Sequence, residues 1–146
     1  MRKILLAAAL VAATACAKQS DHQKSAPAPA TQADPAAANI PTVTVDDVDH
    51  SLAAGSCTPV DANGDGTRKK MGVIPGAVLL TDEDSYDLEL LPPDKSKELV
   101  FYCANTHCGA SHHAASRAIL AGYTNVKVMP QGIAGWVSAG KKTQAM

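Results

Sequence analysis

The 146-residue chain lacks a hydrophobic run long enough to cross a bilayer and has no excess of positive charge. Its apolar segment near the start covers residues 4–15, whereas a membrane-spanning helix needs roughly 20 such residues. Thirteen Lys and Arg against 14 Asp and Glu leave a net charge of −1, which argues against nucleic acid as a partner. No internal repeat is visible, so a repeat architecture is not expected.

The first residues have the pattern of a secretory signal peptide. Arg2 and Lys3 precede the apolar segment, and small residues lie just before Cys16. This pattern predicts a signal peptide over residues 1–15. Cys16 has the position of the lipidated first residue of a bacterial lipoprotein, and we expect it to carry a lipid anchor; cleavage by the ordinary signal peptidase is the alternative. We therefore expect the protein in the periplasm or cell envelope, with the outer membrane as the predicted site of a lipoprotein.

Residues 16–40 consist mainly of Ala, Pro, Gln, Ser and Asp and contain almost nothing to bury. A segment of this composition cannot offset its ordering entropy, so we predict a flexible tether. Residues 41–146 are long enough for one small domain.

Cysteines are scarce in that predicted domain, and their number is odd: Cys57, Cys103 and Cys108. At least one thiol must therefore be unpaired in the monomer, which favours a working cysteine over a disulfide scaffold. Cys57 falls on a predicted strand, where we expect it to be packed rather than reactive.

Short strands alternate with helices along the domain, which predicts an α/β fold with a small parallel sheet flanked by helices. Thr44 and Asp47 have the spacing of a capping box at the start of the first helix. We expect Arg68, Lys69 and Lys70 on a solvated loop. Strands are predicted at 57–62, 77–80, 99–102 and 125–129, and helices at 45–54, 86–91, from 111, and at 132–139.

The clearest strand ends at Cys103, and a polar loop then leads to a helix that Ser111 is expected to cap. Backbone N–H groups of such a loop can turn inward around an anion, and the helix start adds its own N–H groups and positive dipole end. A thiol in this environment is favoured as the thiolate, which is the nucleophile. The loop consists of Ala104, Asn105, Thr106, His107, Cys108, Gly109 and Ala110.

Four short motifs follow one another in the order found in rhodaneses. They are Gly72-Val73-Ile74-Pro75-Gly76-Ala77, Tyr102-Cys103, Gly122-Tyr123-Thr124-Asn125-Val126 and Gly132-Ile133-Ala134-Gly135-Trp136. Residues 42–140 resemble one rhodanese-like sulfurtransferase module. The resemblance implies a compact parallel-sheet fold and an enzyme in which Cys103 forms a persulfide.

The mechanism implied by this resemblance has two steps and needs no cofactor and no metal. The Cys103 thiolate takes the outer sulfur of a small anionic donor, such as thiosulfate or a persulfide, and then passes it to a thiol or to cyanide. The amides of residues 106–109, together with Ser111, bind the donor and hold the charge that develops.

The chain departs from the family pattern around this cysteine. The usual Arg five residues later is replaced by Cys108, the loop is two residues longer, and it contains no Lys or Arg. The usual Asp-Val-Arg after the first strand reads Asp61-Ala62-Asn63. Thiosulfate is therefore less well supported as the donor than sulfur transfer in general.

Two alternatives follow from the residues around Cys103. Cys108 is either a resolving thiol that pairs with Cys103 or a residue that merely fills the position of the missing Arg. His107, His112 and His113 add possible metal ligands, although their spacing matches no common zinc site. A non-enzymatic module of the envelope that senses redox state, an anion or a metal is the alternative function.

Overall fold

The computed structural model of the protein describes residues 39–146. The predicted signal peptide, Cys16 and nearly all of the predicted tether lie outside the described residues. Within the described range, no helix is both long and apolar enough to cross a bilayer.

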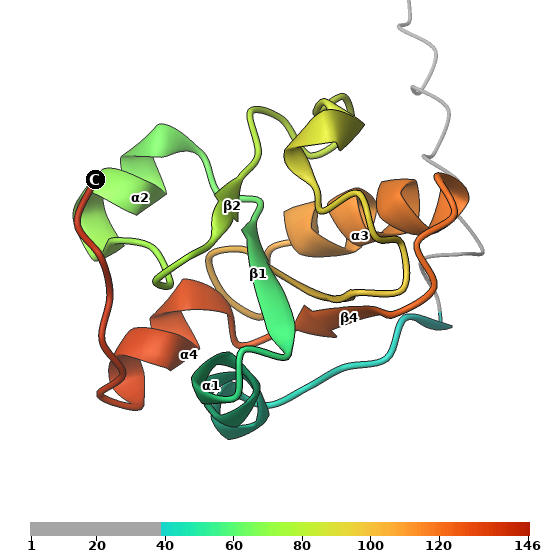
Figure 1. Cartoon of the computed structure of the whole chain (residues 1–146). Helices are drawn as coiled ribbons and strands as arrows, with labels where there is room; N and C mark the ends of the chain where they lie inside the picture. Colours follow the sequence, from blue (N-terminus) through green and yellow to red (C-terminus); the bar gives the residue numbers. More distant parts are fainter. Residues whose placement is uncertain (1–38) are drawn as a thin grey trace, which may run out of the picture. The chain divides into compact units, whose positions relative to one another are not determined.

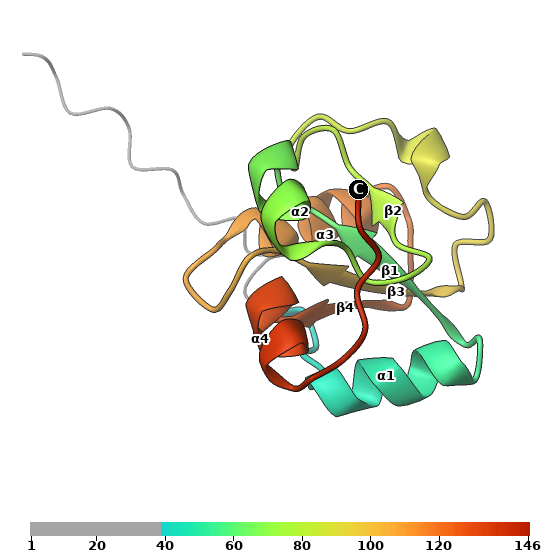
Figure 2. The ribbon, with the colours of Figure 1, turned by 90° about the vertical axis from the view of Figure 1, so that its left-hand side faces the viewer.

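Four parallel strands form one sheet in the order β2-β1-β3-β4, which confirms the predicted parallel α/β fold (Figure 1; all four strands are labelled in Figure 2). Val60 at the centre of the sheet lies opposite Val78 on one side and Phe101 on the other. Because all four strands run the same way, their carboxyl ends meet at one edge of the sheet. The strands are β1 (Cys57–Asp61), β2 (Val78–Leu79), β3 (Glu98–Tyr102) and β4 (Val126–Met129).

Helices cover both faces of this sheet (Figure 2). Alternate side chains of β3 divide between the faces, so that Phe101 packs with α3 while Val100 and Tyr102 pack with α1 and α4. Ile133 and Trp136 of α4 are buried in the cluster on the same face as Val100 and Tyr102. The helices are α1 (Val45–Ala53), α2 (Asp65–Met71), the 3-10 turn η2 (Leu88–Leu90), α3 (Ala110–Leu120) and α4 (Gly132–Ser138).

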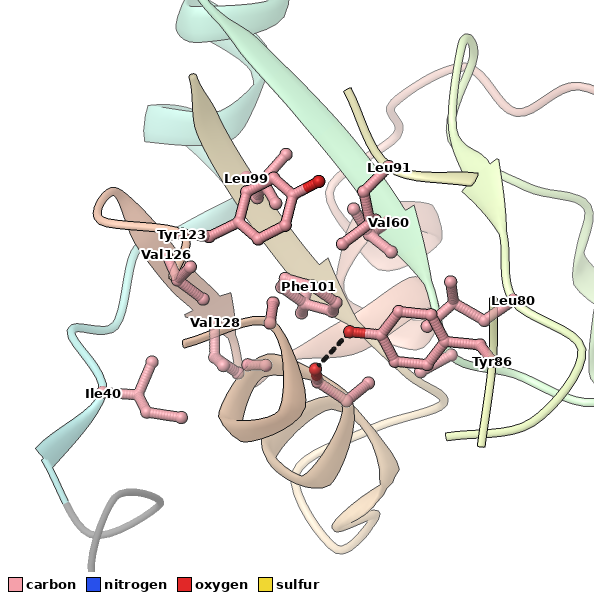
Figure 3. Close-up of a cluster of buried hydrophobic side chains, with 14 of the residues drawn as sticks. Ile40, Val60, Leu80, Tyr86, Leu91, Leu99, Phe101, Tyr123, Val126 and Val128 are labelled. Atoms are coloured by element: carbon pink, nitrogen blue, oxygen red, sulfur yellow. Dashed lines mark hydrogen bonds between the residues drawn. The ribbon is translucent and has the colours of Figure 1, made fainter. Parts of the chain in front are cut away.

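The apolar cluster on the α3 face is closed by two segments outside the regular elements (Figure 3). The Tyr86 hydroxyl is buried and donates a hydrogen bond of 2.8 Å to the Ala114 carbonyl of α3. Ile40, which the sequence assigns to the tether, is buried in the same cluster. The chain next to it pairs with β4, because the Val43 N–H donates to the Val128 carbonyl at 2.9 Å.

The capping box predicted at the start of α1 is present. The Asp47 N–H donates to Thr44 Oγ1 at 3.2 Å, and the Thr44 N–H donates to Asp47 Oδ2 at 3.0 Å. These two bonds satisfy N–H groups that have no partner within the helix.

The predicted solvated loop around Arg68 is wrong. Residues 65–71 form helix α2, and Arg68 is only 5% exposed, although Lys69 and Lys70 are exposed. One Arg68 Nη2 group donates to the Leu80 carbonyl at 2.7 Å and to the Asp61 carbonyl at 3.1 Å. The guanidinium carries five N–H donors, so it can satisfy carbonyls beyond the ends of two strands at once. This contact buries a charge that sequence patterning places in solvent.

Candidate active site

Cys103 follows β3 directly, at the carboxyl edge of the sheet. It is 1% exposed and faces α3, in the same apolar cluster as Leu99 and Phe101. Its Sγ donates a hydrogen bond of 3.1 Å to the Cys108 carbonyl and lies 3.3 Å from the Ser111 hydroxyl. The structure therefore brings the predicted nucleophile, its loop and the start of the following helix into contact.

The backbone of Cys103 is held from behind by α4. The Ile133 N–H donates to the Cys103 carbonyl at 2.8 Å, and the Ala134 N–H donates to the Ala104 carbonyl at 3.0 Å. Gly132 makes this close approach possible, because a Cβ there would clash with the Cys103 carbonyl and lie 2.7 Å from the carbonyl carbon of Ala104. Its φ of +60° also favours glycine. The sequence marks Gly132 only as part of a motif and does not reveal that it positions the cysteine.

The sequence predicts that backbone N–H groups of the loop turn toward the sulfur, but two of them donate hydrogen bonds within the loop instead. The His107 N–H donates to Asn105 Oδ1 at 3.0 Å, and the Cys108 N–H donates to the Asn105 carbonyl at 3.1 Å. Asn side chains compete for nearby backbone N–H groups in this way. As a result, Cys108 presents its carbonyl, an acceptor, to Cys103 Sγ.

The pKa of Cys103 is raised rather than lowered, which corrects the expectation that its environment favours the thiolate. Burial is the largest cause, and the hydrogen bond to Cys108 raises the pKa further. The hydroxyl and backbone N–H of Ser111 act in the opposite direction and lower it. Only the helix start therefore behaves as the predicted anion-stabilising group.

Ser111 is not the helix cap that the sequence predicts. The N-cap is Gly109, α3 begins at Ala110, and Ser111 lies buried in the first turn. Its hydroxyl faces Cys103 Sγ instead of a backbone N–H group of its own helix. The side chain therefore contributes to the environment of the sulfur.

The other two cysteines differ in position and exposure. Cys108 is half-buried and packs against the cluster that contains Cys103. Cys57 is buried at the start of β1, at the opposite edge of the sheet, and burial is the main cause that raises its pKa to about 11. Cys57 is packed, as predicted. All three thiols of residues 39–146 are free.

The histidines near the loop do not converge on Cys103. His113 Nδ1 lies 3.4 Å from the Asp84 carboxylate, and His107 Nδ1 lies 3.5 Å from the Thr106 hydroxyl. Across residues 39–146, the structure brings together no group of three or more His, Cys, Asp or Glu side chains that could hold a metal ion.

Polar groups are buried beside Cys103 at the ends of the flanking strands. Asp61 is fully buried at the end of β1, where its Oδ1 accepts from the Asn63 N–H at 2.6 Å and lies 3.4 Å from Arg68 Nε. In the described part of the chain, Asp61 Oδ2, Asn63 Nδ2 and Gln131 Oε1 are the buried side-chain polar atoms that have no protein partner. They lie at or just after the carboxyl ends of β1 and β4, on either side of β3, at the same edge as Cys103. The sequence does not single out Gln131.

Several solved structures share this fold. A protein of unknown function from Rhodopseudomonas palustris, described as a possible tyrosine phosphatase, is 24% identical with a TM-score of 0.61, covering 75% of this chain and 88% of that one. A rhodanese-like domain from Anabaena is 21% identical with a TM-score of 0.58, covering 74% and 81%. A human single-domain sulfurtransferase is 21% identical with a TM-score of 0.55, covering 68% and 97%. The fold is therefore rhodanese-like.

Among curated proteins, no sequence matches the chain significantly. The family model for the rhodanese-like domain matches residues 44–139, which include all the strands, helices α1 to α4 and the whole loop after Cys103. The chain belongs to the rhodanese-like domain family.

Proposed function

We propose that the protein is an exported sulfurtransferase of the rhodanese type, which carries sulfur as a persulfide on Cys103. The observation that carries this proposal is the position of Cys103 Sγ at the carboxyl edge of the sheet, against the first turn of α3. Ligands of open parallel sheets bind beyond this edge. The family membership and the sulfurtransferase among the structural neighbours support the same chemistry.

The charge of the site favours an organic persulfide over thiosulfate as the donor. The loop of residues 104–110 contains no Lys or Arg, and the Cys108 carbonyl faces Sγ at 3.1 Å. Thiosulfate is a dianion, and its charge would face the Cys108 carbonyl with no cation of the loop to offset the repulsion. The persulfide group itself carries at most one negative charge, and the organic part of the donor can contact the neutral side chains of the loop.

The first step transfers one sulfur atom. The Cys103 thiolate attacks the outer sulfur of the donor, a new S–S bond forms on Cys103, and the donor leaves as a thiol. Because Cys103 is 1% exposed, the loop must open to admit the donor. The persulfide then passes its outer sulfur to an acceptor, for which thiols and cyanide are the candidates.

We place this activity in the cell envelope, attached to the membrane through a lipid on Cys16. The proposal is supported by the signal-like sequence of residues 1–15 and the tether composition of residues 16–40. Changing Cys16 to Ser should move the full-length protein from the membrane fraction to the soluble fraction. Unchanged membrane association would contradict the lipid anchor.

Mass spectrometry of the reduced protein tests the persulfide. In the Cys108→Ser variant, which lacks the thiol of the loop, incubation with glutathione persulfide should add about 32 Da, one sulfur, on Cys103, trapped by an alkylating agent. Adding Cys103→Ser to this variant should abolish the adduct and the transfer of its sulfur to cyanide as thiocyanate, whereas adding Cys57→Ala should retain both. A Cys103→Ser protein that turns over at the wild-type rate would show that the assignment is wrong.

A redox- or anion-sensing module is the second candidate, and the burial of Cys103 under a carbonyl favours it. Such a module would bind or react once for each protein molecule. With a dithiol reductant present, repeated turnover supports the enzyme, and a single stoichiometric event supports the sensor.

A further inference from the structure

Cys108 of the loop lies close to Cys103 at the proposed reaction centre. The turn from Asn105 to Cys108, closed by a 3.1 Å N–H to carbonyl bond, folds the loop back over Cys103. The Cys108 carbonyl then lies 3.1 Å from Cys103 Sγ, and the Cys108 side chain packs against the apolar cluster that contains Cys103. Both thiols are free. Burial is the main cause that raises the pKa of Cys103, and Cys108 raises it further.

The same loop is poorly suited to store a persulfide anion. It has no cationic side chain, and the N–H groups of His107 and Cys108 already donate within the loop. The group that the loop directs at Sγ is a carbonyl, which repels an anion. A persulfide formed on Cys103 therefore lacks strong stabilisation and lies next to a half-exposed thiol that can react with it.

We propose that Cys108 is the resolving thiol of this protein, which releases the sulfur carried by Cys103 as hydrogen sulfide. The inference rests on the proposed function, because it starts from the persulfide on Cys103. The inference identifies Cys108 as the group that reacts with the persulfide. The protein would then reduce persulfide sulfur to sulfide rather than transfer it to an external acceptor such as cyanide.

The chemistry balances without an added oxidant. The Cys108 thiolate attacks Cys103 Sγ, a bond forms between the two cysteine sulfurs, and the bond from Sγ to the outer sulfur breaks. The outer sulfur leaves as HS⁻ with both electrons of that bond, so it is reduced while the Cys108 sulfur is oxidised, and a disulfide joins the two cysteines. A dithiol reductant restores the two thiols by disulfide exchange. Over one cycle, a persulfide and a dithiol give a thiol, hydrogen sulfide and the oxidised reductant.

Cys57 cannot replace Cys108 in this reaction. It is buried at the start of β1, at the opposite edge of the sheet from Cys103. Cys57→Ala is therefore a matched control, which removes a thiol of the same domain without removing the proposed resolving group.

A single-turnover experiment without reductant tests the proposal. The reduced, anaerobic wild-type protein receives one equivalent of glutathione persulfide, and sulfide and intact mass are measured. We expect about one equivalent of sulfide and a mass about 2 Da below that of the reduced protein, from one disulfide. Cys108→Ser should release at least about tenfold less sulfide and retain an adduct of about 32 Da on Cys103. Cys57→Ala should behave as the wild type.

The outcomes separate this inference from the proposed function. A stable adduct on wild-type Cys103, with sulfide release equal in wild type and Cys108→Ser, would overturn the resolving role and leave sulfur transfer standing. If Cys108→Ser, shown to be folded by circular dichroism, forms no adduct and the wild type forms neither adduct nor disulfide, the proposed function itself fails. A disulfide between Cys103 and Cys108 that appears with sulfide, identified by peptide mapping, supports the proposal.

Discussion

Replacing Gly132 with Ala should both lower the free energy of unfolding and change the environment of Cys103. Gly132 has φ +60°, and an Ala there meets the backbone of Cys103 and Ala104, with its Cβ 2.7 Å from a carbonyl carbon. The left-handed conformation costs an L-residue about 1–2 kcal/mol, and forcing a methyl group into a packed site costs about 1–3 kcal/mol more. We therefore expect a loss of about 2–5 kcal/mol in the free energy of unfolding.

Gly55→Ala is the matched control for this prediction. Gly55 has a φ of +65°, and nothing lies within 4 Å of the position that its Cβ would take. Gly55→Ala should therefore lower the free energy of unfolding only by the conformational cost of about 1–2 kcal/mol. Urea unfolding measures both losses, and the rate of Cys103 alkylation by iodoacetamide measures the change at the site. Equal losses in the two variants, with unchanged alkylation of Cys103, would falsify the conclusion that Gly132 positions the cysteine.

Two further substitutions test the buried charge and the sulfur environment. Arg68→Ala should lower the free energy of unfolding by about 3–5 kcal/mol, because it leaves the buried Asp61 carboxylate without its cation. Lys69 is exposed on the same helix, and Lys69→Ala should change the free energy of unfolding by less than about 0.5 kcal/mol. Similar urea midpoints for the two variants would contradict this prediction. Ser111→Ala should raise the pKa of Cys103, since the hydroxyl lowers it, and so move the alkylation midpoint to higher pH and slow the reaction below that midpoint. Ser116→Ala, whose hydroxyl bonds within α3, should leave the pH profile unchanged, and a wild-type profile in Ser111→Ala would show that the contact does not act on the sulfur.

The four strands and helices α1, α3 and α4 follow from local patterns, and the structure confirms them, whereas the helix predicted at 86–91 is only the 3-10 turn Leu88–Leu90. Runs such as residues 99–102 are apolar throughout because β3 is covered on both faces, and this pattern can be read from adjacent residues alone. The capping box of Thr44 and Asp47 is equally local, since its donors and acceptors lie three residues apart.

Helix α2 shows where local patterns are not enough. Residues 65–71 contain one apolar side chain, Met71, so no amphipathic period marks a helix. The segment is helical in a context where Arg68 reaches the Asp61 and Leu80 carbonyls, seven and twelve residues away. Those partners become neighbours only when β1 and β2 pair. The sequence pattern therefore places Arg68 in solvent, although the fold buries it.

The loop after Cys103 shows the same limit at the candidate site. Its residue types predict a polar turn into a helix, and that much is present. The direction of one peptide decides whether the sulfur meets an N–H group or a carbonyl. Here Asn105 takes the two N–H groups, so the Cys108 carbonyl faces Sγ. The composition of the loop does not determine this choice, because both peptide directions are compatible with the same residues.

By itself, the sequence determined the parallel α/β architecture, the family resemblance and the location of Cys103 at the end of a strand, because each depends on short local patterns and on their order along the chain. Only the tertiary structure decided that Cys103 is buried with a raised pKa, that Gly132 must lack a side chain, and that Cys108 folds back onto the sulfur. These properties depend on atoms from separate segments that approach one another only after the sheet and its helices have packed.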